Sequence, residues 1–341
     1  MLKKITIAID AMGGDNSPDK TIQGVYLFLK KNKKNNDFLL NLFGDEKKIL
    51  EKLDKYKISS DLIKIIHTES TVSDEETPLT AVKNSKNTSM WNCIKSQIDG
   101  DADISLSAGN TGVLLVVSRM ILKMMNEVSK PALAGLWPSQ SGINVVLDLG
   151  ANIECNEQNL VDFAELGSAL YKALLPNHQP KVSLLNVGSE EIKGTDMLKN
   201  TYRKLKNLSN NNNFIFKGYI EGNKIMSGDS NVIVTDGFTG NIALKTAEGT
   251  AKFITDNLKK SLSIISLIFS FFSLKKFKNK LDPRKYNGAI FLGLNGPVVK
   301  SHGGTDALGF YYSIDLCYKI VKGDLMHQIK NNLSHLSGDQ K

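Results

Sequence analysis

Glycine turns that carry polar side chains recur along this chain of 341 residues, each directly after a short apolar run. In the first, IDAMGGDNSPDK, Gly13 and Gly14 permit backbone angles that other residues disfavour. Ser17 is a good N-cap and Pro18 a good first helical residue, so a helix is expected to begin there. The free N–H groups of a helix start can hold an anion. Because Asp10 would repel a bare phosphate, it is expected to orient other groups or to handle protons.

Five later turns have the same construction. They are SAGNTGV with Asn110 and Thr111, LDLGANIEC with Asn152, LNVGSEEIKGTD with Lys193, VTDGFTGNIALK with Asp236 and Asn241, and LGLNGPVVKSHGGTD with Asn295 and His302. Each alone is equally well explained as a tight turn, and His302 by a structural role. Together, as loops that follow strands, they are expected along the carboxyl edge of one sheet, where open α/β folds bind ligands. The pattern predicts an extended polar cleft for an anionic substrate.

Several reaction classes lack their sequence motifs. No GxxxxGK[ST] occurs, no GxGxxG follows the first apolar run, and GxSxG is absent. The cysteines, Cys93, Cys155 and Cys317, form no metal-ligand cluster, and none has a recognisable nucleophile setting. We therefore expect no metal, no cofactor and no covalent acyl-enzyme. The cysteine usage, and an N-terminal apolar stretch too short for a secretory signal, favour a reducing cytoplasm.

Lysine dominates the charge of the chain. There are 43 Lys and Arg residues against 35 Asp and Glu, a formal net charge of +8, and only Arg119, Arg203 and Arg284 are arginine. Arginine supplies the bidentate contacts of nucleic-acid readers, so no nucleic-acid partner is expected. The lysine excess reflects either a nucleotide bias of the genome or a positive field that attracts an acidic protein or an anionic membrane.

Short apolar runs alternate with segments of helical spacing. Strands are expected at 5–10, 38–43, 62–67, 103–107, 144–149, 182–186, 214–217, 231–235 and 289–292, and helices at 18–31, 78–97, 111–125, 158–174 and 196–208. Runs that are apolar throughout, such as INVVLDL, are typical of parallel strands covered on both faces. The alternation predicts a Rossmann-like, doubly wound α/β/α sandwich. No linker rich in Pro, Gly or Ser interrupts it, so residues 1–335 are expected to form a single α/β domain.

One segment departs from this alternation. Within residues 247–283, an apolar stretch of 14 residues at 261–274 lies between lysines on both sides. A helix of that length spans about 21 Å, short of the ~30 Å bilayer core, so it cannot cross a membrane. A helix in the lipid interface, packing in a dimer and a buried core helix remain open. The side chains expected to contact a membrane are Ile264, Ile265, Ile268, Phe269, Phe271 and Phe272.

Six motifs occur in a fixed order: IAIDAMGGD, SAGNTG, LDLGAN, GSEEIKG, TDGFTGN and LGLNGPV, the last followed after three residues by HG. Over about residues 5–320 they resemble bacterial acyl-carrier-protein:phosphate acyltransferases. The resemblance implies the fold of phosphate acetyltransferases and isopropylmalate dehydrogenases, with an apolar helical tip that corresponds to 261–274. It also implies transfer of a fatty acyl group from acyl-[acyl carrier protein] to orthophosphate, which gives acyl phosphate for phospholipid (phosphatidic acid) synthesis.

The same resemblance implies partners and a location. Members of that family act as homodimers, lie peripherally on the inner face of the membrane and supply a glycerol-3-phosphate acyltransferase. For this chain we therefore expect acyl carrier protein, orthophosphate, a second subunit and the membrane surface as partners, and a cytoplasmic location.

Orthophosphate can attack a thioester directly, so such a reaction needs positioned N–H groups and a cation rather than a nucleophilic side chain. Lys193, which follows a strand end, is expected to stabilise charge on the phosphate or the oxyanion, and Asp236 and Asn241 to orient phosphate or a bridging water. The residues expected to line the substrate are Asp10, Gly13, Gly14, Asn110, Thr111, Asn152, Asn295 and His302. The alternatives are a CoA-dependent phosphate acyltransferase and a dehydrogenase of related fold.

Overall fold

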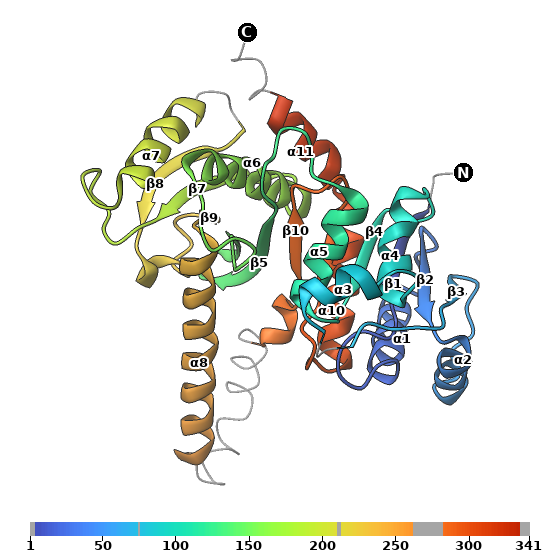
Figure 1. Cartoon of the computed structure of the whole chain (residues 1–341). Helices are drawn as coiled ribbons and strands as arrows, with labels where there is room; N and C mark the ends of the chain where they lie inside the picture. The colour runs from blue at the N-terminus through green and yellow to red at the C-terminus, as the bar shows by residue number, and fades with distance from the viewer. Residues whose placement is uncertain (1–3, 74–75, 210–212, 262–281, 335–341) are drawn as a thin grey trace.

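The computed structural model describes residues 4–73, 76–209, 213–261 and 282–334. Its strands form one 11-stranded sheet in the order β3-β2-β1-β4-β11-β10-β5-β6-β9-β7-β8 (Figure 1). The strands are β1 (Ile5–Asp10), β2 (Phe38–Gly44), β3 (Ile63–His67), β4 (Ile104–Ser107), β5 (Ala132–Ser139), β6 (Gly142–Leu147), β7 (Lys181–Leu185), β8 (Ile215–Ile220), β9 (Val232–Val234), β10 (Ala289–Leu292) and β11 (Val298–Lys300).

Helices cover both faces of this sheet, which confirms the expected α/β sandwich. They are α1 (Asp19–Lys31), α2 (Glu46–Lys55), α3 (Pro78–Asn84), α4 (Ser89–Ile98), α5 (Thr111–Leu122), α6 (Glu157–Leu174), α7 (Asp196–Leu208), α8 (Gly237–Ser261), α10 (Ala307–Lys322) and α11 (Leu325–Ser334), with 3₁₀ turns η2 (Gly222–Lys224) and η3 (Pro283–Tyr286). One core contains side chains of α1, α2, α6, α10 and α11. A second core, on the other face, contains side chains of α4, α5 and α8.

The strand β6 shows why its run is apolar throughout. Val145 and Leu147 point into the first core, whereas Val146 between them points into the second. All three side chains are buried, because successive residues of a strand point to opposite faces and both faces are covered here. The continuous run INVVLDL is thus the expected signature of a strand at the centre of the sandwich.

The directions of the strands correct one expectation from the sequence. β1, β4 and β11 are parallel to one another, but β10 is antiparallel to β11 and to β5, and β5 is antiparallel to β6. β6, β9 and β7 are again parallel, so they run opposite to β1 and β4. The sheet is therefore mixed, and the expectation that all the glycine turns line one edge is wrong. We call the edge at which β1, β4 and β11 end the β1 edge, and the one at which β6, β9 and β7 end the β6 edge.

Several expected helices begin or end differently in the structure, and the one expected at 111–125 ends at Leu122. The helix expected at 18–31 begins at Asp19, with Pro18 at the N-cap position, and the Ser17 hydroxyl donates to Gly13 O at 2.6 Å instead of capping. The helix expected at 78–97 is two helices, because Asn87 has φ +67° and Thr88 caps the second. The strands β5 and β11 were not expected.

The helix α8 is 25 residues long and projects from the body of the fold (Figure 1). Phe253, Ile254 and Leu258 on its distal half are exposed. No helix in the described part of the chain is long and apolar enough to cross a membrane. The side chains expected to contact a membrane fall within 262–281 and so lie outside the described residues: Ile264, Ile265, Ile268, Phe269, Phe271 and Phe272.

Candidate active site

At the β1 edge, the turn after β1 is built around a buried carboxyl. Asp10 is 1% exposed and accepts from the Ser107 hydroxyl at 2.7 Å and from Met12 N at 3.2 Å. Burial raises the pKa of Asp10, and the hydrogen bond from Ser107 opposes that rise. The carboxyl thus lies beneath the turn and joins it to the end of β4, a position suited to orienting the backbone.

The glycines of this turn are in close contact with two other loops. A Cβ on Gly13 would lie 2.6 Å from Asp10 Oδ2 and 2.7 Å from Gly109 N. Gly14 has φ +77°, and a Cβ there would lie 2.8 Å from Ala108 O and 3.1 Å from Gly303 O. The structure therefore brings the turns after β1, β4 and β11 together, and larger residues do not fit at either glycine.

Two buried lysines that were not predicted from the sequence support these loops. Lys20 Nζ donates to Gly303 O at 2.5 Å, and Lys300 Nζ donates to Ala108 O at 3.3 Å. Their side chains are buried although lysine is rarely so. Through these carbonyls the two lysines connect α1 and β11 to the loops that follow β11 and β4.

Asn110, Thr111 and His302 also lie at the β1 edge. Asn110 Oδ1 accepts from Gly112 N at 2.9 Å and from Val113 N at 3.2 Å, so this side chain caps α5. Thr111 is the exposed first residue of that helix. His302 is exposed, and its Nδ1 accepts from Gly304 N at 3.2 Å.

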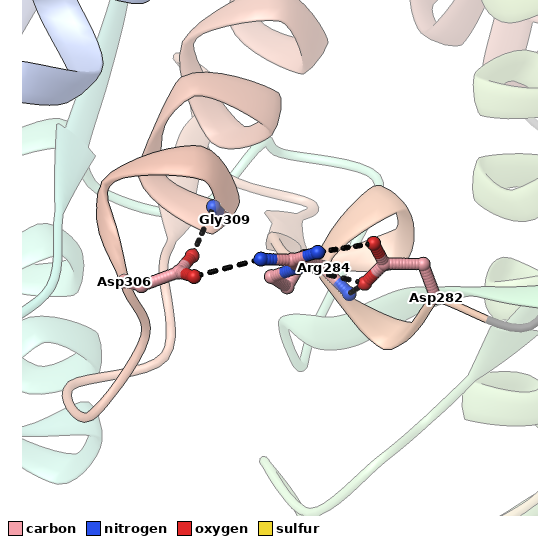
Figure 2. A network of polar contacts seen from close by, with 4 residues as sticks. All are labelled: Asp282, Arg284, Asp306 and Gly309. Atoms are coloured by element: carbon pink, nitrogen blue, oxygen red, sulfur yellow. Dashed lines mark hydrogen bonds and ion pairs between the residues drawn. The ribbon is translucent and has the colours of Figure 1, made fainter. Parts of the chain in front are cut away.

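The loop that contains His302 is held at its far end by an ion-pair network (Figure 2). Arg284 Nη2 donates to Asp282 Oδ2 at 2.6 Å and Nη1 donates to Asp306 Oδ2 at 2.9 Å, while Asp306 Oδ1 accepts from Gly309 N at 2.9 Å. The guanidinium lowers the pKa of Asp282. Burial alone would raise the pKa of Asp306, but Gly309 N–H and Arg284 lower it overall. One of the three arginines therefore fixes the start of α10.

At the β6 edge, Asp148 organises the turn after β6. Its carboxylate accepts from the backbone N–H groups of Leu133 at 3.0 Å, Gly150 at 3.1 Å, Ala151 at 3.0 Å and Asn152 at 2.8 Å, and from Asn152 Nδ2 at 2.8 Å. Burial raises the pKa of Asp148, and these N–H groups oppose the rise. Asp148 lies within the LDLGAN motif but was not predicted as a site residue, although an Asp at the end of an apolar strand is the available signal.

The first turn of α8 lies directly against this loop. Gly237 N donates to Asn152 O at 2.9 Å, and Asn241 Nδ2 donates to Leu149 O at 3.2 Å. Asp236 accepts from Thr239 N and Thr239 Oγ1, both at 2.8 Å, and so closes the start of the helix. The structure therefore brings Asn152, Asp236 and Asn241 together, at the positive end of the α8 dipole.

Lys193 lies in the loop after β7, the neighbour of β9 in the sheet. Asn186 Nδ2 donates to Lys193 O at 3.2 Å, and Gly194 with φ +88° follows. The Lys193 side chain is exposed and its stem runs beside Gly188, where a Cβ would lie 3.1 Å from Lys193 Cγ. Lys193 thus shares the β6 edge with Asp236 and Asn241.

Asn295 lies at the far end of α5 from Asn110, and so apart from the expected substrate residues at the β1 edge. Its Nδ2 donates to Leu122 O at 3.1 Å and to Met124 O at 2.9 Å, at the C-terminal end of α5. Asn110 caps the opposite end, and a helix of 12 residues is about 18 Å long. Asn295 therefore holds the end of a helix, and one phosphate cannot contact both asparagines.

Polar donors at the β6 edge suit an anionic transition state. Amides, a helix N-terminus and a lysine can stabilise negative charge on phosphate or on a thioester carbonyl oxygen. Among residues 4–73, 76–209, 213–261 and 282–334, no group of three or more His, Cys, Asp or Glu side chains is placed to hold a metal ion.

Similarity to known proteins extends over nearly the whole chain. A family model described as "Fatty acid synthesis protein" matches residues 5–328. The chain is 54% identical over 338 residues to a phosphate acyltransferase of Pelagibacter ubique (strain HTCC1062), which covers 98% of this chain and 100% of that relative. It is 42% identical over 344 residues to a phosphate acyltransferase of Parvibaculum lavamentivorans, covering 99% of this chain and 94% of that one.

A solved structure shares the architecture at low identity. The EutD phosphotransacetylase from Staphylococcus aureus superposes with a TM-score of 0.62 at 16% identity and covers 94% of both chains. That likeness shows the fold, and the sequence relatives show the family. Matched from the first strand to α11 by proteins of one kind, this chain belongs to the phosphate acyltransferase family and is an acyltransferase.

Proposed function

We propose that this protein transfers a fatty acyl group from acyl-[acyl carrier protein] to orthophosphate, giving acyl phosphate for phospholipid synthesis. The observation that carries the proposal is the match of nearly the whole chain to phosphate acyltransferases, at 54% identity in one case. The family description, fatty acid synthesis, supports a fatty acyl donor held on a carrier protein.

In the proposed reaction, a phosphate oxygen attacks the thioester carbonyl carbon. The C–O bond forms and the C–S bond breaks, and the carrier-protein thiolate leaves with the electron pair of that bond. The thiolate then takes a proton from solvent, because a free thiol has a pKa of about 8.5. Nothing is oxidised or reduced.

The three cysteines support direct attack rather than a covalent acyl-enzyme. Burial raises the pKa of the Cys93 and Cys317 thiols well above the ordinary value. Burial, with the charge of Asp148, raises the pKa of Cys155 to about 11. Thiols with such pKa values hold little thiolate at pH 7 and are poor nucleophiles.

We assign the chemistry to the β6 edge. Lys193 stabilises charge on the phosphate or the oxyanion, and Asp236, Asn241 and Asn152 orient phosphate or a bridging water. Their positions on neighbouring parallel strands support this assignment. The β1 edge is a second place for phosphate, with the remaining candidates Asp10, Gly13, Gly14, Asn110, Thr111 and His302. The KM for phosphate of the Thr111→Ala and Lys193→Ala variants tells which edge holds it.

An end-point assay tests the reaction. Palmitoyl-[acyl carrier protein] and orthophosphate are supplied together and singly, free carrier-protein thiol is followed, and acyl phosphate is trapped with hydroxylamine. We expect thiol release only when phosphate is present. Release from acetyl-CoA but not from the carrier protein would favour the CoA-dependent alternative. A folded protein that releases no thiol from any donor would contradict acyl transfer to phosphate.

We further propose that the protein is a cytoplasmic homodimer that contacts the inner face of the membrane beside a glycerol-3-phosphate acyltransferase. Half of α8 projects from the body of the fold (Figure 1). The side chains of Phe253, Ile254 and Leu258 on that half are exposed, which supports an apolar contact there. Lysines flank the apolar stretch that follows at 261–274, which suits anionic headgroups.

A further inference from the structure

Five large apolar side chains are exposed at the β6 edge. Ile153 is 76% exposed, Val187 83%, Ile192 81%, Phe238 59% and Ile242 51%. They follow the ends of three neighbouring parallel strands, β6, β7 and β9. Isolated exposed apolar residues are ordinary, but several of them around one group of loops call for a ligand or a partner.

Four of these side chains lie beside a polar residue of the proposed site in the sequence. Ile153 follows Asn152, Ile192 precedes Lys193, and Phe238 and Ile242 are four residues apart on the first turns of α8, beside Asp236 and Asn241. Since Gly237 N donates to Asn152 O, the loop with Ile153 and the start of α8 are in contact. Exposed apolar side chains therefore lie beside the polar residues of the loops after β6, β9 and β7.

That arrangement has the same polarity pattern as an acyl thioester, which has a polar reacting group and an apolar tail. Charged residues lie next to these side chains in the sequence, with Glu190 and Glu191 between Val187 and Ile192 and with Glu154 after Ile153. The Glu191 carboxylate accepts from Tyr202 and pairs with Lys206. The core of a protein–protein interface is depleted of such charges. A narrow hydrocarbon chain can lie between them.

We infer that Ile153, Val187, Ile192, Phe238 and Ile242 form the surface that the fatty acyl chain of the donor covers. This inference rests on the proposed function and names the residues that set its chain-length preference. Burial of apolar surface favours donors with longer acyl chains. Each two-carbon extension of the acyl chain strengthens donor binding by about fourfold when half of the surface of each added methylene is covered.

The test measures kcat/KM for carrier-protein donors of 8, 12 and 16 carbons. We expect the wild-type value to rise with chain length. The double variant Ile192→Ser, Phe238→Ser is expected to lose about tenfold with the 16-carbon donor and about twofold with the 8-carbon donor. Ile98→Ser is the matched control, because Ile98 is an exposed apolar side chain at the end of α4 and takes no part in the site. Its chain-length profile should equal that of the wild type.

Three results would overturn the inference. They are a wild-type kcat/KM that does not depend on chain length, an equal loss with every donor in the double variant, and conversion of a wild-type dimer into monomers by the same substitutions. Light scattering on a sizing column detects the last, which would identify a subunit interface. A wild-type protein inactive with all three donors would instead refute the proposed function.

Discussion

Asp148 accepts five hydrogen bonds, four of them from backbone N–H groups, and it sets the conformation of the loop that carries Asn152. Removing the carboxyl would leave buried donors without an acceptor. We expect Asp148→Ala to lower the free energy of unfolding by about 3 kcal/mol, measured by urea titration. Asp148→Asn keeps one acceptor oxygen and should lose less. Equal losses in the two variants would contradict this reading.

Lys193 is the cation that the proposed reaction assigns to negative charge in the transition state. Loss of one such group typically costs about a hundredfold or more in rate. We therefore expect Lys193→Ala to reduce kcat for phosphate-dependent thiol release about a hundredfold, and Lys193→Arg to retain part of it. Nearly full turnover of Lys193→Ala at saturating phosphate would remove Lys193 from the mechanism.

The sequence allowed us to predict which residue types lie in the loops better than it allowed us to predict the contacts that those residues make. The glycine turns in the sequence predicted which loops carry polar side chains. The structure places each of those turns at the end of a strand. Which residues hold the loops depends on chain segments distant in sequence. Lys300 reaches Ala108 and Lys20 reaches Gly303, so no local pattern marks either lysine.

At the scale of elements, α5 connects the two edges of the sheet, with Asn110 at its start and Asn295 at its end. Because Asn295 satisfies carbonyls of the last turn, Asn295→Ala should lower the free energy of unfolding by roughly 1–2 kcal/mol. We expect the KM for phosphate to change less than twofold. A tenfold rise in that KM, with stability unchanged, would return Asn295 to the substrate site.

The helix α6 contains two buried carboxyls that make stability depend on pH. Burial raises the pKa of Glu165 to about 7 and that of Asp162 to about 6. An unfolded glutamate ionises near pH 4.3, so the folded state binds more protons between there and pH 7, and stability falls as the pH rises through that range.

Substituting Glu165 tests this dependence. Because Gln cannot ionise, the Glu165→Gln variant should have a free energy of unfolding up to about 3 kcal/mol higher than wild type at pH 8. A higher melting temperature of the variant at that pH would show this. At pH 4.5 the difference should be small, because Glu165 is then protonated in the folded protein and roughly 40% protonated in the unfolded chain. A difference of the same size at both pH values would contradict a raised pKa.

Most elements could be predicted because both faces of the sheet are covered, which makes central strands continuously apolar. The helix break at Asn87 was missed because a single left-handed residue hardly disturbs the spacing of apolar side chains. β5 was missed although ALAGLWPSQSGINVVLDL places a Ser- and Gly-containing turn between two apolar runs, which is a hairpin signal.

For the whole molecule, that hairpin decides where the loops lie. β5 ends at Ser139 and β6 begins at Gly142, so two residues reverse the chain, and the strands that pair beyond β6 run opposite to β1 and β4. Apolar periodicity is the same for a strand in either direction. The sequence therefore supported the α/β class but not the separation of the glycine turns between two edges.

Membrane contact is also a property of the whole molecule. We expect the protein to co-sediment with vesicles that contain anionic lipid, and less so at high salt, because lysines flank the apolar stretch at 261–274. The triple variant Ile265→Ser, Phe269→Ser, Phe272→Ser should remain in the supernatant while its activity in solution persists. Equal sedimentation of variant and wild type would contradict a role for this stretch.

At Gly240 the backbone of α8 lies directly against the backbone of the Asp148 loop. A Cβ there would lie 1.9 Å from Asp148 O, so backbone meets backbone and no side chain can yield between them. The 25 residues of α8 form a rod about 37 Å long that is seated at one end (Figure 1). Gly240 therefore lets α8 pack against the Asp148 loop where no side chain would fit, while the far half of the helix stands clear of the body of the fold (Figure 1).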